Sequence, residues 1–267
     1  MKSYPYWHVD AFTLGDAPLT GNQAAVMVLD HWLGDEWLAR IAAENNFAET
    51  AFLVPDTTDA ADWELRWFTP ATEVRLCGHA TLASGHTVLA AGDTDEVRFR
   101  TRQAGILTVS RCADGYDLAL PAIPTVPGDF AEAVALVGGD VREVRLSEHR
   151  YALLVLPDEA SVRALQPDLR ALAALGDWQF ICTAPGTSTD VVSRVFVPGA
   201  GVDEDSFTGS AHAVLTPYWT QRLGQSAFSA LQASARGGAA HCRLNGAQAV
   251  LTGRCATVVE GTFRLPG

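Results

Sequence analysis

Short apolar runs alternate along this chain with segments whose apolar residues recur at helical spacing. Strands are predicted at residues 26–29, 51–55, 151–156 and 180–183, because each is a brief apolar run bounded by polar or turn-forming residues. A helix is predicted over residues 35–45, where Trp37, Leu38 and Ile41 share one face. Another is predicted over residues 168–175, ended by Gly176. The pattern is typical of a mixed α+β protein.

The same order of features occurs twice in the chain. Residues 66–70 and 194–198 each form an extended run that begins with arginine and ends with proline. Each run is followed by an irregular acidic loop, and each loop ends at a glycine, Gly78 or Gly209, that opens an apolar helix. Matched features in the same order indicate an internal repeat.

A predicted hairpin completes each copy of the repeat. Asp114-Gly115 and Asn245-Gly246 separate pairs of strand-like segments, and both dipeptides favour the two-residue type I′ turn. Each half therefore reads as strand, loop, helix and hairpin. The sequence predicts an N-terminal lobe over residues 1–124 and a C-terminal lobe over residues 125–267, joined where prolines cluster.

The helices that open at Gly78 and Gly209 differ from surface helices. Residues 80–84 and 211–215 are small or apolar almost all round, which predicts helices inside the fold. The N-terminus of such a helix carries a partial positive charge, and glycine lets the backbone approach a ligand closely. We expect the two N-termini to meet where the lobes join and to hold an anion such as a substrate carboxylate.

Composition narrows the function classes. The chain has 267 residues, 48% of them hydrophobic, and a net charge of −12, with no basic run that would favour nucleic-acid binding. No apolar stretch is long enough for a membrane span, and the N-terminal residues lack a signal-peptide core, so a cytoplasmic protein is predicted. The five cysteines are dispersed and the histidines lack metal-ligand spacing, so neither disulfides nor a metal site is expected.

An ordered set of motifs resembles one known family. The motifs are DAFT at 10–13, GNQAAV at 21–26, AETAF at 48–52, FTP at 68–70, CGHAT at 77–81 and DSFTGSAH at 205–212. Each is weak alone, but the set spans nearly the whole chain in the order seen in PhzF-like phenazine biosynthesis proteins. Gln23 and Ser206 depart from the usual text, because prolines are frequent at those two positions.

The resemblance implies a fold and an activity. The family shares the diaminopimelate epimerase fold: α+β, with two pseudo-symmetric lobes, each a curled, barrel-like sheet around a central helix, and the active site in the cleft between them. Its members are cofactor-independent isomerases that use no metal, flavin or pyridoxal group and commonly form homodimers. The name-giving enzyme isomerises a dihydro-hydroxyanthranilic acid, so the expected partner of this chain is a small carboxylate substrate.

The resemblance also assigns the chemistry of the first lobe. Glu49 matches the carboxylate that takes a proton from one substrate carbon and returns it to another. Its predicted place, between the end of an apolar helix and a strand, favours partial desolvation, which suits a group that must both accept and donate a proton. His79, at the opening of the first central helix, is expected to bind the substrate or to help move the proton. Asn22 and Gly78 are carried as substrate-binding residues.

The second lobe supplies the remaining candidates. Asp205 is expected to hold or polarise a polar group of the substrate. Ser210, together with the N–H groups around Gly209, is expected to bind the substrate carboxylate. Asp and Ser are also common helix caps, and that role is compatible with substrate binding.

Two alternative functions stay open at this point. Diaminopimelate epimerase uses one cysteine from each lobe; Cys77 stands at the first of those positions and Asp205 at the second. A two-base racemase or epimerase using Asp205 with Glu49 or Cys77 is therefore an alternative to the one-base isomerase. A non-catalytic binding protein with the same fold is a third possibility.

Overall fold

The computed structural model describes residues 2–265 and divides into two compact units. The first contains the chain up to Ala119 together with the segment from Thr252 onward, and the second runs from Leu120 to Leu251. Strands β8 (Gly115–Pro121) and β17 (Gln248–Gly253) carry the chain from one unit to the other. Among the described residues, no helix combines the length and the apolar character needed to span a membrane.

The first unit is a sheet with one central helix. Its strands are β1 (Lys2–Ala11), β2 (Asn22–Val28), β3 (Glu49–Pro55), β4 (Trp63–Phe68), β5 (Glu73–Val74), β6 (Glu96–Thr101), β7 (Ile106–Cys112) and β18 (Cys255–Leu265). Hydrogen bonds join them in the order β18-β1-β2-β3-β4-β6-β7-β8, with β2–β3 and β4–β6 parallel and the other neighbours antiparallel. Helix α1 (Asp35–Asn45) covers β3, with Leu38, Ile41 and Ala42 buried. The bounds of α1 are those predicted from its apolar periodicity.

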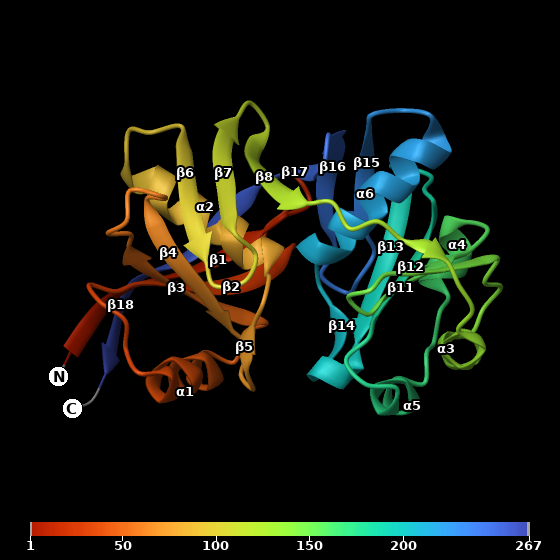
Figure 1. Ribbon diagram of the computed structural model, residues 1–267, viewed down its shortest axis with the longest axis horizontal. Coiled ribbons are helices and arrows are strands. Elements are labelled where there is room, and N and C mark those ends of the chain that lie inside the picture. Colours follow the sequence, from red (N-terminus) through yellow and green to blue (C-terminus); the bar gives the residue numbers. More distant parts are fainter. Residues whose placement is uncertain (1, 266–267) are drawn as a thin grey trace. The chain divides into compact units, whose positions relative to one another are not determined.

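Helix α2 (Gly78–Ala91) lies inside the curl of this sheet, against β1, β2, β3 and β7 (Figure 1). Every residue from Gly78 to Gly85 is buried, as the small and apolar sequence predicts. Close packing requires glycine at position 85, because a Cβ there would lie 2.4 Å from the Val109 side chain on β7. This packing fixes the position of the helix start inside the unit, and with it the side chains of the first turn.

The second unit repeats this plan. Its elements are β9 (Val126–Pro127), α3 (Ala131–Val137), β10 (Glu143–Leu146), β11 (Tyr151–Val155), α4 (Glu159–Arg163), α5 (Leu169–Ala174), β12 (Gln179–Pro185), β13 (Val191–Val197), the 3₁₀ helix η1 (Pro198–Ala200), β14 (Val202–Asp205), α6 (Gly209–Leu223), β15 (Ala227–Gln232) and β16 (Gly238–Asn245). The order β10-β11-β12-β13-β15-β16 alternates antiparallel and parallel pairs as β1-β2-β3-β4-β6-β7 does. The predicted α+β fold with two matching lobes, each a curled sheet with a central helix, is confirmed.

The repeat extends to one pair of side-chain interactions. Arg66 on β4 donates two hydrogen bonds to Glu73 on β5, both 2.7 Å long. Arg194 on β13 does the same to Glu204 on β14, at 2.7 and 2.9 Å. Each guanidinium also lies over the ring of the phenylalanine two residues further on, at 5.0 and 4.9 Å from its centroid. The acidic loop after each extended run thus fixes the short strand that leads to the central helix.

Three features differ from the sequence expectations. The C-terminal strand β18 belongs to the first unit, because it pairs along its length with β1. Glu49 begins β3 rather than ending a helix, since α1 stops at Asn45 and Asn46 adopts a left-handed conformation. The hairpins after β7 and β16 form, but neither Asp114 nor Asn245 has the positive φ of a type I′ turn, which is left to the following glycine in each case.

Candidate active site

Four predicted residues of the first unit converge at the start of α2. Glu49 opens β3 and Asn22 opens β2, and these parallel neighbours are in register through Ala24 and Glu49. Cys77 is the N-cap residue of α2 and His79 its second residue. Because α2 packs directly on β2 and β3, its first turn meets the beginnings of both strands.

The imidazole of His79 is the centre of this cluster. Its Nε2 lies 3.1 Å from Oε2 of Glu49, and its Nδ1 lies 3.1 Å from the side-chain amide of Asn22. The sulfur of Cys77 lies 3.6 Å from Nδ1 and 4.0 Å from Nε2. The side chain of His79 is 4% exposed and that of Glu49 is 16% exposed, so Glu49 is the more accessible of the two.

The surroundings of His79 and Cys77 set their protonation states. Burial lowers the pKa of His79, but the neighbouring Cys77 and Glu49 more than offset this, and the net pKa lies well above its usual value. Burial, reinforced by the charge of Glu49, raises the pKa of Cys77 to about 11. Near neutral pH the imidazole of His79 therefore keeps its proton, and the thiol of Cys77 is neutral.

The carboxylate of Glu49 is paired with the imidazole of His79. Its Oε2 is buried, and its polar neighbour at 3.1 Å is Nε2 of His79. Buried polar atoms are normally paired with another polar group, and here the imidazole is that partner. The arrangement can accept a proton at the carboxylate and donate one from the imidazole.

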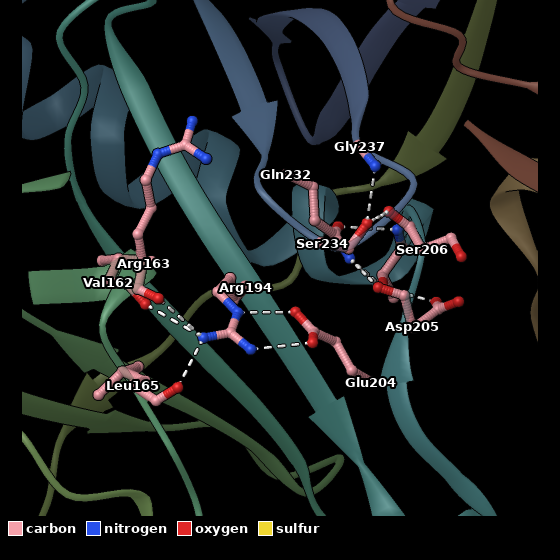
Figure 2. A network of polar contacts seen from close by, with 11 residues as sticks. Val162, Arg163, Leu165, Arg194, Glu204, Asp205, Ser206, Gln232, Ser234 and Gly237 are labelled. Carbon is pink, nitrogen blue, oxygen red and sulfur yellow. Dashed lines mark hydrogen bonds and ion pairs between the residues drawn. The ribbon is translucent and has the colours of Figure 1, made fainter. Parts of the chain in front are cut away.

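The candidates of the second unit lie around the start of α6. Thr208, the N-cap residue, donates from its hydroxyl to Asp205 at 2.6 Å, and Gln232 bridges the backbone oxygen of Asp205 and the backbone N–H of Thr208, at 2.8 and 2.9 Å. Ser234 donates to the backbone oxygen of Ser206 at 2.7 Å. Figure 2 shows the contacts of Asp205, Ser206, Gln232 and Ser234 beside the Arg194–Glu204 pair. Several hydrogen bonds therefore hold the segment that carries Asp205 in place. The hydroxyl of Thr208 bonds to Asp205 and does not cap the helix.

Ser210 has a partner that its sequence position did not indicate. Its hydroxyl donates to Oε1 of Gln179, 3.2 Å away. Gln179 opens β12 as Glu49 opens β3, and the next residues of the two strands, Phe180 and Thr50, pair with equivalent phenylalanines on β13 and β4. The repeat thus places Gln179 and Ser210 where the first unit has Glu49 and His79.

Gln179 and Gln232 are the site residues that sequence reasoning missed. Gln232 is fully buried and holds the turn that carries Asp205. Only the strand registers relate Gln179 to Glu49, because the short sequence match of the repeat begins at Arg66 and Arg194. At the departure noted for Gln23, the amide nitrogen lies 3.2 Å from Nε2 of His8, a contact that proline cannot make.

The residues that could hold a metal ion are Glu49, Cys77 and His79. Their donor atoms all lie within 4.8 Å of one another. Among residues 2–265, this is the group of three or more His, Cys, Asp or Glu side chains that lie close enough to share an ion. The sequence indicated no such site, because the three residues show no metal-ligand spacing along the chain.

Comparison with known proteins places this geometry in a family. The family model described as phenazine biosynthesis-like protein matches residues 9–261. An uncharacterized isomerase of Pseudomonas aeruginosa is 43% identical over 263 residues, covering 97% of this chain and 98% of that protein. The crystal structure of a PhzF-family phenazine biosynthesis protein from Enterococcus faecalis superposes with a TM-score of 0.89 at 39% identity, covering 99% of this chain and all of that one.

A more distant structure carries the fold alone. A predicted epimerase from Pseudomonas aeruginosa superposes with a TM-score of 0.74 at 22% identity, covering 98% of this chain and 100% of that one. The relatives identify the protein as an isomerase, and its α+β fold is epimerase-like. The chain belongs to the PhzF family of phenazine biosynthesis-like proteins.

Proposed function

We propose that this isomerase moves a proton on a small carboxylic acid, and that the carboxylate of Glu49 removes the proton and returns it. The observation that carries the proposal is the buried contact between Oε2 of Glu49 and Nε2 of His79, which lie 3.1 Å apart. A carboxylate in such a setting is positioned to take a proton from a substrate carbon next to a carbonyl or unsaturated system.

His79 has a complementary role in this scheme. Its raised pKa keeps a proton on the ring near neutral pH, so that it can stabilise negative charge as the substrate proton leaves. The amide of Asn22 at Nδ1 fixes the orientation of the ring and directs Nε2 toward Glu49. Loss of either contact is expected to slow proton transfer rather than to prevent substrate binding.

The one-base scheme is favoured over the two-base racemase by the contrast between the units. A two-base enzyme needs a second group that exchanges protons near neutral pH. The thiol of Cys77, with a pKa raised to about 11, is poorly suited to that task. At the positions of Glu49 and His79 the second unit has Gln179 and Ser210, neither of which titrates. The carboxylate of Asp205 is already bound by the Thr208 hydroxyl.

Substrate binding is the role we propose for the second unit. The N-terminus of α6 at Gly209, with the hydroxyl of Ser210, is suited to a substrate carboxylate. Asp205 is suited to a second polar group of the substrate. Gly78 is proposed to supply backbone N–H groups at the start of α2, as Gly209 does at the start of α6. Two expectations stay predictions: the cytoplasmic location, which rests on the sequence composition, and the homodimer, which the family resemblance implies.

Hydrogen exchange tests the proposal. The purified protein is incubated in D₂O with a panel of small carboxylic acids that includes dihydro-hydroxyanthranilate, and deuterium uptake is measured by mass spectrometry. Glu49→Gln removes the proposed base, and Glu44→Gln is the matched control because Glu44 is an exposed carboxylate on α1. We expect uptake with the unmodified protein and with Glu44→Gln, but not with Glu49→Gln. Full uptake by a folded Glu49→Gln protein would overturn the proposal.

A further inference from the structure

The hydrogen bonds of Gln232 can run in one direction only. The backbone N–H of Thr208 can only donate, so the side-chain atom of Gln232 that lies 2.9 Å from it is the acceptor Oε1. The other end of the amide is therefore Nε2, which donates to the backbone oxygen of Asp205 at 2.8 Å and to Oγ1 of Thr208 at 3.2 Å. Gln232 is fully buried, so these contacts fix its orientation.

The direction continues through Thr208 to Asp205. The Thr208 hydroxyl accepts from Gln232, which leaves its own hydrogen for Oδ2 of Asp205, 2.6 Å away. A proton on Oδ2 would face that hydrogen, so the arrangement favours the ionised carboxylate. These hydrogen bonds, from Gln232 through Thr208 to Asp205, are called the Gln232 relay below.

The repeat indicates that the fold does not require this relay. Thr101 ends β6 as Gln232 ends β15, and each pairs with the residue just before the arginine of the repeat, on β4 or β13. The hydroxyl of Thr101 donates to the backbone oxygen of Gly105 at 2.8 Å, within its own loop. The equivalent position of the first unit thus serves its hairpin, which points to a role for Gln232 other than folding.

We propose that Gln232 is a positioning residue that determines the class of substrate. By holding Asp205 as an ionised acceptor, it requires the substrate group that Asp205 binds to be a hydrogen-bond donor, either a hydroxyl or an ammonium. The proposal rests on the substrate-binding role proposed for Asp205. With the substrate carboxylate at the start of α6, it narrows the substrates to carboxylic acids that also carry a hydroxyl or amino group.

Neutron diffraction from crystals soaked in D₂O tests the relay without any substrate. We expect a deuterium on Oγ1 of Thr208 that points to Oδ2 of Asp205, deuterium on Nε2 of Gln232, and none on Oδ2. A deuterium on Oδ2, or a Thr208 hydroxyl that points away from Asp205, overturns the proposal.

Matched compounds test the substrate class. The deuterium-exchange panel is arranged in sets that share one carbon skeleton and carry an amino, hydroxyl or methoxy group at one position. We expect exchange with an amino or hydroxyl member, and exchange at least about 10-fold slower with the methoxy member, which can only accept. Comparison of the amino and hydroxyl members shows which donor is used. Equal rates for donor and methoxy members overturn the proposal. Absence of exchange from every set contradicts the proposed function instead, while the neutron structure still decides the state of Asp205.

Thr208→Val is the variant that breaks the relay with least disturbance. The Thr208 hydroxyl does not cap α6, and the backbone N–H stays bound to Gln232. We expect this variant to raise KM for the donor-bearing substrate about 10-fold, to change kcat less than about 3-fold, and to remove most of the preference over the methoxy member. Gln232→Met should act in the same direction.

Two further variants make the result specific. Thr208→Ser keeps the hydroxyl and should restore the preference for the donor-bearing substrate. Thr220→Val is the matched control, because the Thr220 hydroxyl bonds to backbone oxygens of its own helix. If Thr208→Val, shown to be folded by circular dichroism, keeps the full preference, the relay does not determine the substrate class.

Discussion

The two units share a strand plan but differ at the equivalent corner. Where the first unit places Glu49 against His79, the second places Gln179 against Ser210. Both pairs lie where the first strand residue meets the first turn of the central helix, so the backbone arrangement is common and the side-chain chemistry is not. The same backbone arrangement therefore carries a carboxylate and an imidazole in the first unit and a neutral, hydrogen-bonded pair in the second.

Substitutions of the equivalent residues Glu49 and Gln179 test this difference, and the Glu49 substitution should have the largest effect of those considered. Glu49→Gln should lower the rate of substrate deuterium exchange at least about 1,000-fold, about 4 kcal/mol of barrier, because it removes the base. Gln179→Leu, which changes the equivalent residue of the second unit, should lower it less than about 10-fold. Mass-spectrometric exchange rates compare the two, and equal losses would contradict an unequal division of roles.

The equivalent histidine and threonine of the central helices provide a test through stability. His212 on α6 takes the place of Thr81 on α2, is fully buried and lies against the Phe207 ring. Burial lowers its pKa to about 4. The unfolded chain therefore binds a proton below pH 6.5 that the folded chain does not, and stability is lost as the pH falls toward 4.

The magnitude follows from that difference in pKa. Between pH 7 and pH 4 the His212 contribution amounts to about 3 kcal/mol of unfolding free energy. His212→Leu should remove this part of the pH dependence, as urea unfolding at both pH values would reveal. If the variant and the unmodified protein lose the same stability over this range, His212 is not the group responsible.

Substitutions at the second residue of each central helix should lower activity by smaller factors than Glu49→Gln does. His79→Gln is expected to lower kcat/KM about 100-fold, mostly through kcat, because the proton-bearing ring beside Glu49 is lost. Ser210→Ala should lower it about 10-fold, mostly through KM, because one hydrogen bond to the substrate or to Gln179 is lost. Steady-state kinetics on the substrate found by exchange separates the two. A large kcat effect for Ser210→Ala would mean that the second unit takes part in proton transfer.

Much of the fold could be predicted because short stretches of the sequence determine its helices and strands. The apolar periodicity of α1 predicted its bounds, and the small, apolar stretches after Gly78 and Gly209 predicted the buried helices α2 and α6. The internal repeat predicted two units with the same plan. The turn type failed because a dipeptide preference does not decide which residue of a hairpin takes the positive φ.

The site was less accessible from the sequence because its geometry depends on distant pairings. Glu49 and His79 came from the family motifs, but their contact depends on β3 lying beside β2 and on α2 packing across both. The equivalence of Gln179 and Glu49 appears only in the strand registers. The proximity of Glu49, Cys77 and His79 has the same origin, since Glu49 lies 28 positions before Cys77 in the chain.

The fate of the transferred hydrogen tests the one-base account most directly. Substrate deuterated at the acidic carbon is converted in a single turnover in H₂O, and the product is analysed by mass spectrometry and NMR. A single base on Glu49 predicts that part of the original deuterium reappears at the new carbon, because the same carboxylate carries it. Product in which the original carbon is inverted and always carries a solvent hydrogen would contradict the account and establish a two-base enzyme.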